Sequence, residues 1–160
     1  MNAKSEVARA LAAAVVDIES SAAQLREALM AERTALNAGD EQQLLAATAL
    51  KTQLLQRLDA LERERVHLLE QCVERGRSQP FAMSKALGGR PEALSAWEQA
   101  LATLEDCRLQ NQANGSAVEA RLRHVRRALE LLTGARADAD LYGRSGTAET
   151  LRRSQTLARI

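Results

Sequence analysis

The sequence predicts an all-α protein, an antiparallel bundle of three long helices that forms a coiled-coil-like rod, with a flexible or short-helical C-terminal tail. Three observations predict this fold class. Aromatic residues make up only 2% of the 160 residues, and the abundant Ala, Leu, Arg, Glu and Gln favour helices over sheets. Apolar residues recur at alternating steps of three and four, which is typical of helices packed along their length. Both prolines and three of the eight glycines, which interrupt helices, gather in residues 76–91.

The first helix is predicted over residues 5–37. A turn at Gly39 and Asp40 follows, because glycine readily adopts the left-handed conformation that ends a helix and aspartate can cap the next one. Gln43 completes a capping-box pattern with Asp40. A turn this short makes the first two helices antiparallel neighbours. The apolar seam of the first helix consists of Leu11, Val15, Ile18, Ala22, Leu25, Leu29, Glu32 and Leu36.

The second helix is predicted over residues 40–75, and a connection with one short helical turn around Met83–Leu87 extends over residues 76–90. Two cations, Lys51 and Arg65, lie on its apolar stripe. We expect both to bury their methylene groups while their charged heads reach water. The stripe consists of Leu44, Ala47, Lys51, Leu54, Leu58, Leu61, Arg65, Leu68 and Cys72, widened by Leu55 and Leu69.

The third helix is predicted over residues 91–133, with Pro91 in its first turn. Asn111, Asn114 and Gly115 interrupt its middle, where glycine costs about 1 kcal/mol relative to alanine. Two interpretations stay open. In the first, which we favour slightly, Asn111 pairs across the bundle to fix the register and Gly115 permits a close helix approach. In the second, another chain docks here in a groove or at a hinge. The predicted seam is Leu94, Trp97, Leu101, Leu104, Arg108, Asn111, Gly115, Val118, Leu122, Val125, Leu129 and Leu132.

These elements divide the chain into a helical bundle over residues 1–134 and a mobile binding tail over residues 135–160. The tail has too few apolar residues to fold alone. Its single tyrosine, Tyr142, is either an anchor for a partner or packs back on the bundle. Residues 120–160 carry nine arginines against four acidic residues, whereas the rest of the chain has 13 Lys and Arg against 17 Asp and Glu. The C-terminal end is therefore basic, which favours an acidic partner.

The sequence offers little for catalysis. Glu64 and His67 form an E-x-x-H pattern, but a di-iron bundle needs two copies and further inward carboxylates, and His67 is expected to face solvent. No phosphate-binding glycine motif is present. We therefore predict no enzyme activity, no catalytic residue, no cofactor and no metal site.

Other features point to an ordinary cytoplasmic protein. The arginine cluster at residues 121–127 lacks interleaved aromatics, so a solvated helix surface is favoured over nucleic-acid binding. No signal peptide or membrane span is recognised, which predicts a cytoplasmic location without membrane insertion. Cys72 and Cys107 are expected to be buried free thiols.

Two segments resemble the FlgN family of flagellar export chaperones. The first is residues 107–115, with Cys107-Arg108, Asn111 and Asn114-Gly115. The second is residues 131–146, with Leu131-Leu132, Gly134 and Leu141-Tyr142-Gly143-Arg144-Ser145-Gly146. Lys51, three residues before Leu54-Leu55, and the order of the helices agree as well, so the resemblance covers nearly the whole chain in length and element order.

The resemblance implies a type III secretion chaperone that binds hook-associated junction proteins, keeps them from associating early and delivers them to the membrane export gate. The export ATPase complex is a further partner to consider, and a homodimer is left open. The segment after the long helix would bind partners, with Tyr142 linked to gate docking. Cargo contacts would come from the end of the third helix and from the tail, around Leu141, Leu151 and Leu157, and Gly143 would be a further partner-binding residue of the tail. The rival from another class is a self-associating coiled-coil scaffold with no export role.

Overall fold

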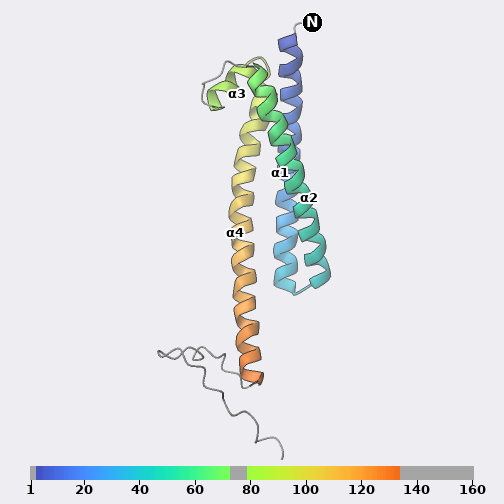
Figure 1. Ribbon diagram of the computed structural model, residues 1–160, viewed down its shortest axis with the longest axis vertical. Coiled ribbons are helices and arrows are strands. Elements are labelled where there is room, and N and C mark those ends of the chain that lie inside the picture. Colours follow the sequence, from blue (N-terminus) through green and yellow to red (C-terminus); the bar gives the residue numbers. More distant parts are fainter. Residues whose placement is uncertain (1–2, 73–78, 134–160) are drawn as a thin grey trace, which may run out of the picture. The chain divides into compact units, whose positions relative to one another are not determined.

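The computed structural model describes residues 3–72 and 79–133. In these residues it contains four helices and no strand, so the predicted all-α fold class is confirmed. Figure 1 labels the helices α1 (Ala3–Ala38), α2 (Glu41–Cys72), α3 (Gln79–Leu87) and α4 (Pro91–Thr133). The chain divides into two compact units, residues 1–118 and 119–160. Among the described residues, the search for a helix with the length and hydropathy of a membrane span found none.

The turn between α1 and α2 has the predicted chemistry. Gly39 has a φ of 71°, in the left-handed region where a glycine avoids steric strain. The Gln43 backbone N–H donates to Asp40 Oδ1 at 2.9 Å, so Asp40 caps α2. In this first unit α1 and α2 therefore lie antiparallel and in contact.

The core of the first unit is built on α1. The eight residues of its predicted seam are all buried, and they are joined by small side chains that let the neighbouring helices approach closely. These small residues are Ala14, Ser21, Ala28 and Ala35.

The face of α4 that meets α1 differs from the prediction by about one residue. Leu101, expected in the seam, is 49% exposed, whereas its neighbour Ala100 is fully buried. The buried positions recur every seven residues, at Ala93, Ala100, Cys107 and Asn114. Small side chains face the small side chains of α1 because this permits the closest helix packing, and the larger leucines are left on the flanks. The heptad period was predicted correctly, but its phase was wrong.

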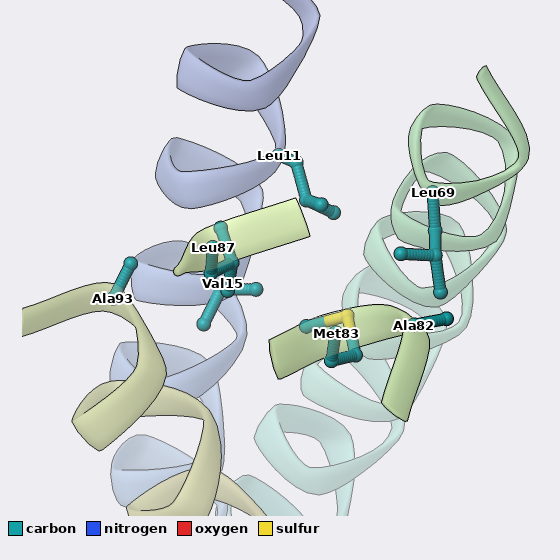
Figure 2. Close-up of a cluster of buried hydrophobic side chains, with 7 residues drawn as sticks. All are labelled: Leu11, Val15, Leu69, Ala82, Met83, Leu87 and Ala93. Atoms are coloured by element: carbon teal, nitrogen blue, oxygen red, sulfur yellow. The ribbon is translucent and has the colours of Figure 1, made fainter. Parts of the chain in front are cut away.

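Helix α3 closes one end of the first unit (Figure 2). Its Ala82, Met83 and Leu87 are buried against Leu11 and Val15 of α1, and Leu69 and Ala93 complete this cluster. The short turn expected around residues 83–87 is thus a nine-residue helix. Its apolar face supplies core that the α1–α2 hairpin alone would lack.

Arg65 corrects a second expectation, because its charged head does not reach water. The whole side chain is buried. Its guanidinium donates twice to the Glu62 carboxylate, at 2.6 and 2.7 Å, and lies 4.7 Å from the centroid of the Trp97 ring. A partly exposed carboxylate and an aromatic face thus replace water as the partners of this cation. Arg65 joins α2 to α4.

Candidate functional site

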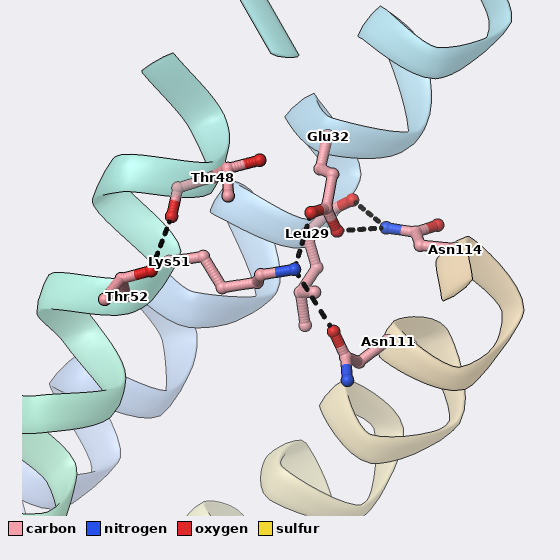
Figure 3. Close-up of polar contacts among 7 residues, drawn as sticks. All are labelled: Leu29, Glu32, Thr48, Lys51, Thr52, Asn111 and Asn114. Carbon is pink, nitrogen blue, oxygen red and sulfur yellow. Dashed lines mark hydrogen bonds and ion pairs between the residues drawn. The ribbon is translucent and has the colours of Figure 1, made fainter. Parts of the chain in front are cut away.

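A polar cluster crosses the first unit at the segment that the sequence singled out (Figure 3). Lys51 Nζ of α2 lies 2.5 Å from Glu32 Oε1 of α1 and donates to Asn111 Oδ1 of α4 at 3.3 Å. The Asn114 amide donates to Glu32 Oε2 at 2.8 Å and to the Leu29 carbonyl at 3.0 Å. Both asparagines therefore bond to other helices, and the cluster ties α1, α2 and α4 together.

Such contacts fix the lengthwise register of α4 against α1 and α2. Lengthwise sliding of α4 would separate the Asn114 amide from Glu32 and from the Leu29 carbonyl and leave this buried amide unpaired. Asn114 Oδ1 is buried and has no partner among the described residues, so the cluster is not fully satisfied. Lys51 keeps 19% of its side chain exposed. Its stem is covered as expected, but its ammonium is held by Glu32.

Gly115 does not have the role that the register interpretation gave it. It is exposed, and a Cβ added to it would meet no heavy atom within 4 Å. No other helix of the described residues approaches closely here, because Asn114 and not Gly115 faces α1. The one-residue shift of the α4 seam explains the error.

A shallow cavity of about 250 Å³ lies beside the polar cluster. Leu25 and Leu29 of α1 line it, together with Asn111 of α4. Burial raises the pKa of the Cys107 thiol in its wall, so this thiol is a poor nucleophile. Arg108, also in its wall, donates to exposed Glu105, and this contact lowers the pKa of the Glu105 carboxyl. The site offers binding surface but no acid–base pair.

The second unit presents a different surface. Along α4, Leu122, Val125, Leu129 and Leu132 recur at steps of three and four, and they are 50, 52, 54 and 84% exposed. We call these four residues the apolar stripe. They were predicted as part of a buried bundle seam, whereas all four are exposed. A continuous, regularly spaced apolar stripe on an exposed helix indicates a docking surface.

The contacts within the first unit give the register of α4 against α1. Cys107 contacts the Ala22 carbonyl and Asn114 contacts that of Leu29, so the two helices run parallel and their contacting residues lie 85 apart in the sequence. In the second unit the apolar stripe continues the same spacing of three and four, so the sequence pattern carries no signal that these residues are exposed.

Basic residues surround the apolar stripe. Arg121, Arg123, Arg126 and Arg127 are all exposed. Arg123 lies 3.8 Å from Glu119, one turn earlier on the helix, whereas no ion pair joins Arg121 or Arg126 to another described residue. Glu119 and Glu130 are exposed on the same segment, so the surface is apolar along its centre and carries a net positive charge around it, with four arginines against two glutamates.

The predicted tail contacts fall outside the described residues. These are Leu141, Tyr142, Gly143, Leu151 and Leu157. They stay predictions.

The E-x-x-H pattern behaves as an ordinary helix surface. His67 is exposed, and its Nε2 lies 2.8 Å from the Gln71 side-chain nitrogen. Within residues 3–72 and 79–133 there is no group of three His, Cys, Asp or Glu that could hold a metal ion.

Comparison with models of protein families matches residues 1–150 to the family described as FlgN protein. Comparisons with curated proteins and with solved structures give no match. The matched range contains the four helices, the polar cluster, the apolar stripe and Tyr142.

Proposed function

Because the chain belongs to the FlgN family of flagellar export chaperones, we propose that it binds hook-associated junction proteins in the cytoplasm. Binding covers their association surfaces until export, which prevents premature assembly. The chaperone then delivers each cargo to the type III export gate. It acts by binding and release, without catalysis, and its partners are proteins and not nucleic acid.

The observation that supports this proposal is the apolar stripe. Leu122, Val125, Leu129 and Leu132 are at least half exposed in a chain whose α1 seam is almost completely buried. Full burial of such side chains stabilises a complex by about 1.5–3 kcal/mol each. An amphipathic cargo helix laid along α4 would cover them, as in other helix-to-helix recognition.

The tail supplies a second part of the proposal. Leu141, Gly143, Leu151 and Leu157 are proposed as further cargo contacts, and Tyr142 as the residue that docks on the export gate. A segment that orders only on binding gives modest affinity, which suits a chaperone that must release its cargo. We propose that the polar cluster around Asn111 and Asn114 holds α4 in place against the other helices and does not contact cargo.

The test measures binding of purified hook-associated proteins to the full chain by isothermal titration calorimetry. Leu129→Asp places a charge on the apolar stripe and is expected to weaken binding at least tenfold. The matched control is Leu131→Asp, which changes an equally apolar but 84% exposed leucine. Leu131 lies about half a turn from the stripe's centre, so this variant should bind normally. Equal binding by both variants would reject the stripe as the cargo site.

Two further variants separate cargo binding from gate docking. Tyr142→Ala should retain cargo but lose capture of export-gate components, and a chain ending at residue 134 should be weakened in both. Sedimentation of the free chain tests the rival scaffold. A stable oligomer that Leu129→Asp dissociates, together with no binding of junction proteins, would establish a self-associating coiled coil instead.

A further inference from the structure

The charges beside the apolar stripe are distributed unevenly around the helix. With 3.6 residues per turn, Arg121 flanks the stripe on one side and Arg126 flanks it on the other. Arg123 and Arg127 point away from it, and Glu119 is paired with Arg123. Glu119, seven residues before Arg126, and Glu130, four residues after it, lie on the same side of the helix but farther from the centre of the stripe. Arg121 and Arg126 are therefore the charged residues that lie closest to its two edges.

In paired helices these bordering positions determine the choice of partner, because they face the bordering positions of the other helix. Arg121 and Arg126 are exposed and have no ion pair with a described residue, so their charge is available to a partner. A second copy of this helix would bring the same two cations to the edges of the stripe, together with Glu119 and Glu130. Between Glu119 and Thr133, four arginines stand against two glutamates, so self-pairing also meets a net repulsion.

We propose that Arg121 and Arg126 are specificity-determining residues that select an amphipathic helix with carboxylates on both borders of its apolar seam. This inference rests on the proposed function, because it assigns the chemistry of the partner at the same stripe. Leucine-like residues of the partner cover Leu122, Val125 and Leu129, and its flanking Glu or Asp residues pair with the two arginines. The apolar contact supplies affinity, and the charged borders exclude helices with basic flanks.

The probe is a pair of synthetic fluorescein-labelled helical peptides with identical leucine seams. One carries Glu at all bordering positions and the other carries Lys, and like-charge repulsion keeps each from self-associating at neutral pH. Binding to the 160-residue chain is measured by fluorescence anisotropy at low salt. The Glu peptide should bind about tenfold or more tightly than the Lys peptide, with the difference shrinking as salt screens the charges.

Two double variants test the assignment of residues. Arg121→Glu with Arg126→Glu should reverse the preference between the peptides. Arg123→Glu with Arg127→Glu makes the same change in net charge on the far side of the helix and should keep the preference of the unmodified chain. All four arginines are exposed, so both variants should fold, which circular dichroism checks.

Three results would overturn the inference: equal binding of the two peptides, binding of neither, or an equal loss of preference in both double variants. The last result would show that only the overall positive field matters. The proposed function is tested separately, by the calorimetry with junction proteins. If Leu129→Asp abolishes junction-protein binding but the Arg121 and Arg126 variant keeps the peptide preference, the stripe stands and the charge selection is wrong.

Discussion

Lys51 of α2 and Glu32 of α1 form an ion pair of 2.5 Å in which the carboxylate side chain is only 7% exposed. Removing one partner of such a pair costs more free energy than the pair itself contributes, because the other partner is left as a desolvated charge. Lys51→Met should therefore destabilise the fold by about 2–4 kcal/mol. Urea unfolding followed by circular dichroism measures the change.

The control for this prediction replaces both charges. Glu32→Met with Lys51→Met removes the stranded carboxylate and should recover much of the loss, since apolar replacements of buried pairs are tolerated. The cost of Lys51→Met alone would then exceed that of the double variant. Equal costs would mean that Glu32 is solvated without Lys51.

Arg65 should also be a strong determinant of stability. Arg65→Leu removes a buried cation that lies 4.7 Å from the Trp97 centroid and bonds to Glu62. We expect a loss of about 2–3 kcal/mol and a shift in Trp97 fluorescence, since α2 and α4 lose a polar connection. Arg63→Leu is the matched control. Arg63 is 76% exposed and, among the residues that the structure describes, pairs only with Asp59 on its own helix, so its loss should cost under about 0.5 kcal/mol.

Much of this fold could be predicted because helix pairing leaves a periodic trace in the sequence. The α1 seam and the Gly39–Asp40 turn were correct, since each depends on a local pattern. The phase of α4 was not predictable in the same way. Counting large apolar residues favoured Leu101, whereas the structure buries Ala100 because small residues permit a closer approach to α1. Periodicity in the sequence predicts the spacing of buried positions, whereas packing against the neighbouring helix determines which residue is buried at each of them.

The candidate site could likewise be predicted only in part. Asn111 and Asn114 stood out as polar residues in an apolar pattern, and both are bonded across the bundle. Their partners Lys51 and Glu32 were recognised as charged residues on the predicted seams. Which asparagine each of them contacts depends on the register between the helices, which the sequence alone does not give. The exposure of Leu129 could not follow from its own pattern, because buried and unpartnered seams have the same period.

Two glycines should respond oppositely to substitution by alanine. Gly39 has a φ of 71°, where a Cβ is strained, so Gly39→Ala should lower the free energy of unfolding by about 1 kcal/mol. Gly115 is exposed within α4 with no atom near the added Cβ, so Gly115→Ala should raise it by up to about 1 kcal/mol. Thermal unfolding of both variants measures this. A destabilised Gly115→Ala would mean that α4 bends there.

Cys107 should make the stability of the first unit depend on pH in the alkaline range. Burial raises the pKa of its thiol, and its Sγ lies 3.7 Å from the Ala22 carbonyl oxygen. Below the unfolded pKa of about 8.5, the thiol is protonated in both states and contributes no pH dependence. Above it, the unfolded chain loses a proton that the folded chain retains, so stability falls as pH rises toward the folded pKa.

Cys107→Ser keeps a donor for Ala22 but does not titrate. Urea unfolding under reducing conditions between pH 8 and 10 should therefore show a shallower decline for this variant. Parallel declines would show that the thiol ionises as readily in the folded chain as in the unfolded one.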